Sequence, residues 1–287
     1  MPYPAGGLTD TVTRVLSNEL ADILGQNVIV ENKAGAGGKI GLDQVKRSAP
    51  DGYTLGLAVP ATMVTLPLTN PAYDIEPLKD FTPIGRAVET FVVLVTNPQL
   101  GVNSAAEFVA LGKSRSPELA YGTPGVGTSF HFATEILNQA MGIKALHVPY
   151  QGESAILNDL AGGHLDYTLA TNTARPFVEG KRLTALGIST PERHPAFPDV
   201  PTFKELNYQA DDNGWVGYVG PANMPEDVLE KVSAAFRQAL SSPKVREQYA
   251  NMGYTVLDDT PADMLAIIER TTERYTKLLD SGAIKID

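Results

Sequence analysis

The stretch Leu119-Ala120-Tyr121-Gly122-Thr123-Pro124-Gly125-Val126-Gly127-Thr128-Ser129 carries the clearest indication of the fold. Its first four residues have the composition of a strand, and the pattern that follows Ser129 is helical as far as Met141. A glycine-rich turn between a strand and a helix is typical of an open α/β sheet, whose ligands bind outside the carboxyl ends of the strands. The stretch therefore predicts an α/β unit in which the hydroxyl groups of Thr128 and Ser129 lie at a helix start.

A second glycine turn, Pro4-Ala5-Gly6-Gly7-Leu8-Thr9-Asp10, leads into a helical pattern over Thr9–Leu24. The free N–H groups and the positive dipole end of a helix start attract anions, and glycine lets a ligand approach the backbone. The alternative is an ordinary helix entry with Thr9 or Asp10 as the N-cap. Two such turns in two similarly built units favour an anion held between facing helix N-termini.

Strands and helices alternate along two parts of the chain, and this order predicts α/β units with parallel sheets. The third part of the chain is helical. We expect strands at residues 27–31, 53–58, 119–122, 145–149, 165–171 and 183–189, and late helices at residues 226–240, 244–252 and 262–279.

The most economical domain arrangement is discontinuous. Residues 1–97 combine with residues 215–287 in a first lobe, and residues 98–214 form an inserted second lobe. The chain then crosses between the lobes near residues 95–98 and near residues 213–216. Two domains joined by two crossings can close on a ligand as a clamp.

Composition excludes several kinds of function. The net charge is −10, which disfavours nucleic acid and anionic membranes as partners. The chain has no cysteine, and its four histidines lack the spacing of a zinc motif, so we expect no metal site. No apolar run approaches the roughly 18 residues that span a bilayer.

Enzyme motifs are absent from the sequence as well. The run Gly35-Ala36-Gly37-Gly38-Lys39-Ile40 has isoleucine where a dinucleotide fingerprint needs its last glycine, so we interpret these glycines as structural and expect no cofactor. His131, just inside the helix after Ser129, is better explained as a structural residue that bonds within the turn. An enzyme acting on a small acid and the effector-sensing domain of a transcription regulator remain alternatives.

Polar residues follow two further predicted strands, where a ligand cleft would be lined. Tyr150 and Gly152 come after one strand, and Thr171 and Asn172 come after the next. Arg175 can pair with a carboxylate through two hydrogen bonds, or can be a solvated surface residue.

Several long blocks resemble the tripartite tricarboxylate transporter receptor family, and together they span nearly the whole chain. The resemblance implies a two-lobed type II periplasmic-binding-protein (Venus flytrap) fold, no catalysis, and a periplasmic, monomeric receptor that delivers a small carboxylate to membrane permease subunits. The blocks are Tyr3-Pro4-Ala5-Gly6-Gly7-Leu8-Thr9-Asp10, Val30-Glu31-Asn32-Lys33-Ala34-Gly35-Ala36-Gly37-Gly38, Ala49-Pro50-Asp51-Gly52-Tyr53-Thr54-Leu55, His147-Val148-Pro149-Tyr150, Leu160-Ala161-Gly162-Gly163-His164-Leu165-Asp166 and Pro198-Asp199-Val200-Pro201-Thr202.

The resemblance also implies site residues. In the family the proline-glycine loop holds one ligand carboxylate through backbone groups and ordered water, and the hydroxyl turn of the second lobe and one strand-end loop complete the site. Carried onto this sequence, the loop is Tyr3, Ala5, Gly6 and Gly7, shaped by Asp10, and the second lobe supplies Gly127, Thr128, Ser129, Tyr150 and Gly152.

Two features depart from the family pattern. Family members commonly carry an acid at the end of the strand that here reads Leu169-Ala170-Thr171-Asn172, and its absence predicts a ligand without an amine, such as a dicarboxylic or aromatic acid. The sequence also begins in turn residues that usually follow a strand. We therefore expect that a first strand and an export signal belong to the full protein.

Overall fold

The computed structural model describes residues 1–210 and 213–286, and its contacts divide the chain into two units. Unit 1 contains residues 1–90 and 215–276, and unit 2 contains residues 91–214 and 277–287. These limits differ from the expected lobes of 1–97 plus 215–287 and 98–214. Residues 91–97 join unit 2 because the strand β3 (Val93–Thr96) pairs with two strands of that unit. The last helix, α11 (Pro261–Asp280), runs from unit 1 into unit 2.

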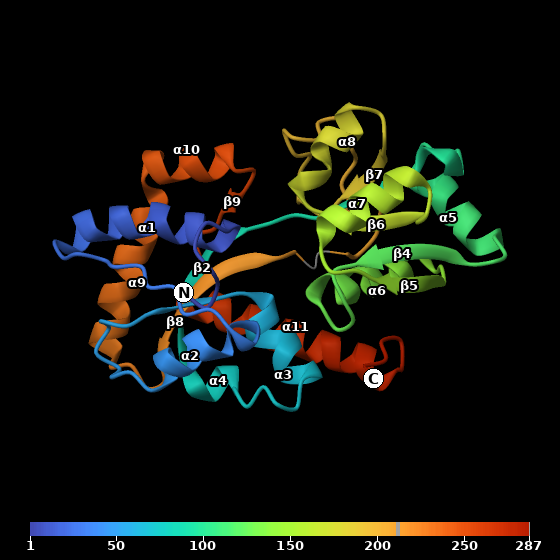
Figure 1. Ribbon diagram of the computed structural model, residues 1–287. Helices are drawn as coiled ribbons and strands as arrows, with labels where there is room; N and C mark the ends of the chain where they lie inside the picture. Colours follow the sequence, from blue (N-terminus) through green and yellow to red (C-terminus); the bar gives the residue numbers. More distant parts are fainter. Residues whose placement is uncertain (211–212, 287) are drawn as a thin grey trace. The chain divides into compact units, whose positions relative to one another are not determined.

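Unit 1 is built on a four-stranded sheet in the order β1-β8-β2-β9. All three strand pairs are antiparallel. Helices lie on both sides of this sheet (Figure 1). The strands are β1 (Gly56–Ala58), β2 (Phe81–Glu89), β8 (Trp215–Pro221) and β9 (Thr255–Val256), and the helices are α1 (Leu8–Leu24), η1 (Ala36–Gly38), α2 (Lys39–Lys46), η2 (Ala61–Thr65), α3 (Leu66–Thr69), α4 (Pro77–Asp80), α9 (Glu226–Ser241), α10 (Pro243–Asn251) and most of α11.

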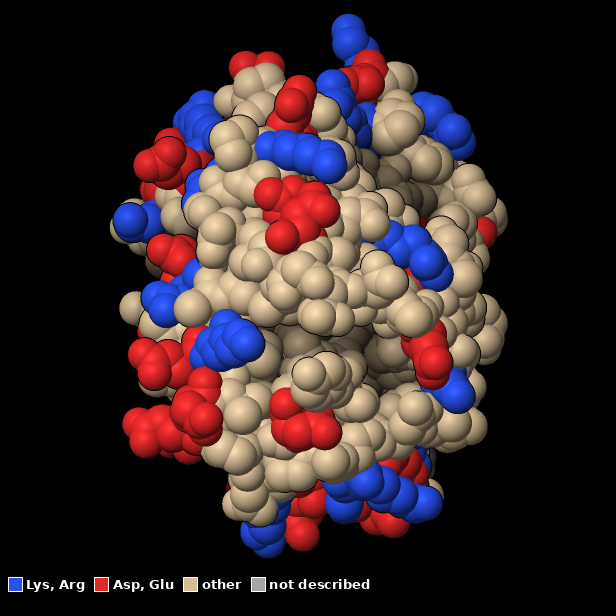
Figure 2. All heavy atoms as spheres, turned by 90° about the vertical axis from the view of Figure 1, so that its left-hand side faces the viewer, with Lys and Arg blue, Asp and Glu red and all other residues tan. Residues whose placement is uncertain are grey.

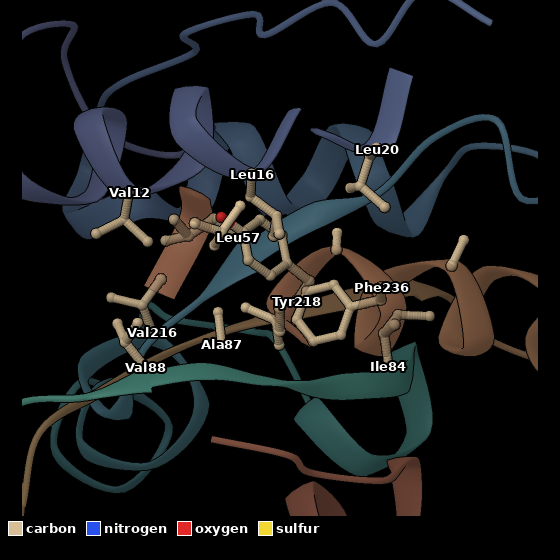
Figure 3. Close-up of a cluster of buried hydrophobic side chains, with 14 of the residues drawn as sticks. Val12, Leu16, Leu20, Leu57, Ile84, Ala87, Val88, Val216, Tyr218 and Phe236 are labelled. Carbon is tan, nitrogen blue, oxygen red and sulfur yellow. The ribbon is translucent and has the colours of Figure 1, made fainter. Parts of the chain in front are cut away.

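The core of unit 1 fixes α1 on the sheet. Val12, Leu16 and Leu20 recur every fourth residue and are buried, and they point from α1 toward Ala87 and Tyr218 of the sheet (Figure 3). Complete burial of one such side chain contributes about 1.5–3 kcal/mol by transfer from water. The Tyr218 hydroxyl also lies 2.8 Å from Oγ1 of Thr13. The start of α1, with the glycine loop before it, is therefore held in a defined position on unit 1.

Unit 2 contains a five-stranded mixed sheet in the order β5-β4-β6-β3-β7. β4 pairs in parallel with β5 and β6, whereas β3 pairs antiparallel with β6 and β7. Besides β3, the strands are β4 (Leu119–Thr123), β5 (Ala145–Pro149), β6 (Tyr167–Ala170) and β7 (Thr184–Ile188), and the helices are η3 (Pro98–Leu100), α5 (Ala105–Ser114), α6 (Ser129–Met141), α7 (Glu153–Gly162), η4 (Asn172–Ala174) and α8 (Arg175–Glu179).

The two faces of this sheet bury two separate cores, because successive residues of a strand point to opposite faces. On β3, Leu94 belongs to the core that also contains Leu137 of α6, whereas Val93 and Val95 belong to the core that contains Leu160 of α7. The sheet therefore lies between α6 and α7, and the turns that lead into both helices follow parallel strands.

Three expectations about unit 1 are wrong. Residues 27–31 form no strand. The Glu31 carbonyl accepts from the amino group of Met1, the N–H of Lys33 just beyond donates to the Met1 carbonyl, and Ile29 is 80% exposed. The sheet is antiparallel because β8 returns from the distant end of the chain and inserts between β1 and β2. The N-cap of α1 is Gly7 instead of Thr9 or Asp10, and no side chain caps this helix.

The glycines at residues 35–41 are explained by packing. A Cβ atom at Gly38 would lie 3.0 Å from Cγ2 of Thr62, and Gly38 has φ +99°, which favours glycine. At Gly41 a Cβ atom would lie 2.8 Å from Cα of Pro2. These contacts agree with the structural interpretation of this run.

Acidic and basic side chains are interspersed on the face shown in Figure 2. That face offers no continuous basic area of the kind that binds nucleic acid. No described helix is both long enough and apolar enough to cross a membrane.

Candidate functional site

The loop before α1 surrounds a hollow in unit 1. Gly6 adopts φ +84°, and Gly7 is the extended N-cap of the helix. The hollow measures about 460 Å³ and is lined by Tyr3, Pro4, Ala5, Gly6, Gly7, Thr9 and Val59. Because no side chain caps α1, the N–H groups of its first turn are left for a ligand or for water. Four of the five predicted residues of this loop thus line one hollow.

Asp10, the fifth, lies behind the loop and holds its shape. Its side chain is 4% exposed. One carboxylate oxygen accepts from the Gly6 N–H at 2.9 Å and from Nε of Arg14 at 2.8 Å, and the other accepts from Nδ2 of Asn32 at 2.9 Å. The Asn32 amide also donates to the carbonyl of Tyr3 at 3.0 Å. Asp10 therefore connects both ends of the loop to the helix.

The same contacts determine the charge of Asp10. Hydrogen bonds from Arg14, Gly6 and Asn32 hold the pKa of its carboxyl well below the usual range. Asp10 is ionised at neutral pH, and the guanidinium of Arg14 balances its charge. With Asp10 already paired, the carboxylate of a ligand would meet the uncapped helix start.

In unit 2 the turn after β4 is closed by its own side chains. The Thr128 hydroxyl donates to the carbonyl of Gly125 at 2.9 Å and accepts from the N–H of His131 at 3.3 Å. Thr128 is therefore the N-cap of α6, and Ser129 is the first residue of the helix. Gly127 has φ +69°, a conformation that favours glycine.

Two stacked histidines, His131 of α6 and His147 of β5, form hydrogen bonds with residues of this turn and of the end of β4. Nδ1 of His131 accepts from the N–H of Gly127 at 3.1 Å, and Nε2 of His147 lies 2.6 Å from Oγ1 of Thr123. The ring centroids of the two histidines are 3.8 Å apart. Burial, with a smaller effect of the neighbouring His147, lowers the pKa of His131 to about 4. His131 thus bonds within the turn as expected, and it is neutral at pH 7.

The loops after β5 and β6 reach the same sheet edge as this turn. β4, β5 and β6 run parallel, so their carboxyl ends lie together. Gly152 is the N-cap of α7, again without a capping side chain. The Tyr150 hydroxyl donates to Asp159 at 2.8 Å. Burial and this carboxylate raise the pKa of Tyr150 to about 12.

The end of β6 carries a contact that the sequence did not predict. The carboxylate of Glu153, the first residue of α7, accepts from the N–H of Thr171 at 2.5 Å and from the Thr171 hydroxyl at 3.0 Å. We expected a ligand without an amine because no acid follows β6 in the sequence. Glu153 brings a carboxylate to this strand end from another element, so this reason for excluding an amine no longer holds. The sequence offers one indication that Glu153 lies near the site, which is that it directly follows the predicted site residue Gly152.

Asn172 and Arg175 continue from this strand end. The amide oxygen of Asn172 is buried and has no hydrogen-bond partner within residues 1–210 and 213–286. Nε of Arg175 donates to Glu179 at 2.7 Å, and the Arg175 side chain is 48% exposed. The partner of Arg175 in the structure is therefore a residue of its own helix. Among the described residues no group of three or more acidic or histidine side chains could hold a metal ion.

Comparisons with known proteins agree with this description. The family model for the tripartite tricarboxylate transporter family receptor matches residues 12–283. Protein BugT of Bordetella pertussis is 32% identical over 289 residues, which cover 100% of this chain and 89% of BugT. A solved periplasmic transporter is 31% identical with a TM-score of 0.78, covering 100% of this chain and 96% of that chain.

Two further solved structures contain a ligand. Rpa4515 of R. palustris with adipate is 26% identical with a TM-score of 0.78, covering 99% of this chain and 95% of its own. MatC of Rhodopseudomonas palustris with bound malate is 29% identical with a TM-score of 0.73, covering 96% of each chain. The α/β fold with two sheets is thus that of periplasmic binding proteins. The chain belongs to the tripartite tricarboxylate transporter receptor family, whose members are transport receptors and not enzymes.

Proposed function

We propose that this protein is an extracytoplasmic solute receptor that binds a small carboxylate and delivers it to the permease subunits of a tripartite tricarboxylate transporter. The observation that carries the proposal is the uncapped start of α1 beside Gly6 and Gly7, with Asp10 already paired behind it. Backbone N–H groups at a helix start suit a carboxylate. Closure of the two units around the ligand is part of the proposal, because a receptor that signals binding to a permease needs two distinguishable states.

The second unit supports the same chemistry. The helices α6 and α7 both start at the sheet edge where parallel strands end, after Gly127 and Gly152 respectively. The start of α6 offers N–H groups to an anion, whereas the first residue of α7 is itself the acid Glu153. We propose Gly127, Thr128, Ser129, Tyr150, Gly152, Thr171 and Asn172 as the contribution of unit 2.

Within the carboxylates we propose dicarboxylic or aromatic acids as the first candidates. Adipate and malate, present in two solved relatives, are both dicarboxylates. The periplasm is the proposed location, since one solved relative is a periplasmic transporter.

A thermal-shift screen of mono-, di- and tricarboxylates, aromatic acids and amino acids is expected to show one stabilising class. A ligand that binds only the folded state stabilises it by about 2.7 kcal/mol at 100 times its dissociation constant. Protein freed of co-purified ligand by unfolding and refolding is the starting material. A flat response to the whole panel would contradict a carboxylate receptor. Small-angle scattering with the best acid should show a smaller radius of gyration, which tests closure.

Replacing Gly7 by valine is expected to weaken carboxylate binding by roughly tenfold or more, a loss of about 1.4 kcal/mol. Gly7 has φ −81°, and a Cβ atom there would meet only the carbonyl of Pro4, at 3.9 Å. The substitution therefore disturbs the approach of a ligand without straining the backbone. Isothermal titration calorimetry measures the affinity, and urea unfolding checks the fold. Gly7→Ala should give an intermediate loss; unchanged affinity in both variants would argue against the loop.

A further inference from the structure

The carboxylate of Glu153 joins two loops at one edge of the unit 2 sheet. Glu153 opens α7 after the loop that follows β5, and both its oxygens accept hydrogen bonds from Thr171, the residue after β6. The helix α7 packs against β4 and β6 (Figure 1). The carboxylate of Glu153, which belongs to α7, therefore lies at the end of β6, although α7 precedes β6 in the chain.

This edge is also where the proposed anion-binding groups of unit 2 lie. β4 has β5 on one side and β6 on the other, with all three strands parallel. Neighbouring strands lie about 4.8 Å apart, so a small acid can reach across all three strand ends. The helix start at Thr128 and Ser129, which follows β4, therefore lies at the edge that Glu153 bridges.

Glu153 has no ion-pair partner among the described residues. Arg175 pairs instead with Glu179, and Arg115 with Asp166. Asp159, six residues further along α7, accepts from the Tyr150 hydroxyl. A carboxylate has about four acceptor positions, and Thr171 occupies two of those of Glu153. The group can accept further hydrogen bonds but repels a second anion.

We propose that Glu153 is a specificity-determining residue that selects carboxylic acids carrying a hydrogen-bond donor, a hydroxyl or an ammonium group, over unsubstituted acids. This inference rests on the proposed function. The carboxylate of the ligand binds at the start of α6, and the donor on its carbon chain bonds to a free acceptor position of Glu153. An unsubstituted chain leaves that position unused in a site from which water is withdrawn.

The test compares ligands that differ only in the donor. Succinate, L-malate and L-aspartate share four carbons and two carboxylates, and 3-phenylpropionate, phenyllactate and phenylalanine form the matched aromatic series. Calorimetry on the wild-type chain should show the hydroxyl or ammonium member of one series binding at least about tenfold more tightly than the unsubstituted member, the size of one hydrogen bond to a charged group. Comparing the affinities for L-malate and L-aspartate then shows whether the preferred donor is a hydroxyl or an ammonium group.

Glu153→Gln keeps the size of the side chain and one acceptor oxygen for Thr171 but removes the charge. In this variant the preference should fall below about threefold, with the unsubstituted acid bound as well as before or better. Glu118→Gln is the matched control, because Glu118 is exposed just before the start of β4, at the other end of that strand. It should leave the preference unchanged. Urea unfolding of both variants checks that the fold is retained.

The possible failures are distinguishable. Absence of binding by every acid in both series, and in the broader carboxylate screen, overturns the proposed function and the role of Glu153 with it. Equal binding of substituted and unsubstituted acids to the wild type overturns the role of Glu153 while the carboxylate receptor stands. A preference that survives in Glu153→Gln assigns the selection to another residue.

Discussion

Replacing Asp10 by alanine is expected to lower the free energy of unfolding by about 3 kcal/mol and to abolish measurable carboxylate binding at micromolar concentrations. The N–H of Gly6 and the amide of Asn32 lose a charged acceptor, and the guanidinium of Arg14 loses its ion-pair partner and keeps only its hydrogen bond to Asn32. Hydrogen bonds to charged groups each contribute about 1.5–3 kcal/mol. The sum is smaller here because Arg14 is 49% exposed and can be hydrated.

The loss of affinity has a separate cause. Without Asp10, the Gly6 N–H is released, and Asn32 keeps its bond to the Tyr3 carbonyl and the one it accepts from Arg14. The loop then samples several conformations, and ordering it takes part of the binding free energy. The start of α1 is unchanged in Asp10→Ala, so the loss of affinity in this variant reports how much the arrangement of the loop contributes to binding.

Urea unfolding and calorimetry measure the two effects on the same protein. Asp22→Ala is the matched control because Asp22 is an exposed acid on the same helix, and it should change stability by less than about 0.5 kcal/mol. Asp10→Asn should fall between alanine and wild type, since it keeps one acceptor oxygen. A loss below about 1 kcal/mol in Asp10→Ala, with affinity retained, would show that other contacts hold the loop.

The second large effect is a loss of stability in mild acid. The pKa of His131 is about 4 in the folded protein, whereas an exposed histidine has 6.5. Between pH 4 and pH 6.5, His131 therefore binds a proton in the unfolded chain but not in the folded protein. His131 alone should make the free energy of unfolding fall by about 3 kcal/mol as the pH drops from 6.5 to 4, with no further change below.

Neighbouring groups change the total profile. Burial also lowers the pKa of His147, which adds to the loss in the same direction. Burial raises the pKa of Glu135, so protonation of Glu135 stabilises the fold and opposes that loss. The depressed pKa of Asp10 acts in a lower range, because its contribution is lost only as the pH falls below the ordinary range for aspartate.

Comparison with a variant isolates the share of His131. In His131→Asn the side-chain oxygen can still accept from Gly127 but does not titrate. Urea unfolding from pH 7.5 to 4 should show a shallower loss in this variant than in the wild type, by about 3 kcal/mol over the range. His164→Asn changes an exposed histidine and should keep the wild-type slope. Identical slopes in wild type and His131→Asn would mean that His131 is solvated in the folded protein.

The helices, caps and turns of this protein are determined by interactions between residues close in the sequence, so a sequence pattern can predict them. The repeat of apolar residues predicted α1 and α9, and Ser104 caps α5 through the N–H of Glu107, three residues along the chain. The glycine turns at residues 4–10 and 122–129 also stand where they were predicted, each before a helix. Helix periods, caps and turns depend on neighbours within about four residues.

Strand pairing and charge at the site depended on the tertiary structure. Nothing local in Trp215–Pro221 says that it inserts between β1 and β2 and makes that sheet antiparallel. Residues 27–31 have the composition of a strand, yet a strand exists only where a partner supplies its hydrogen bonds. The acid at the end of β6 comes from Glu153, 18 residues before Thr171. The sequence by itself determined the helices, the turns and the family, whereas contacts between distant segments decided the sheets and the position of the Glu153 carboxylate at the end of β6.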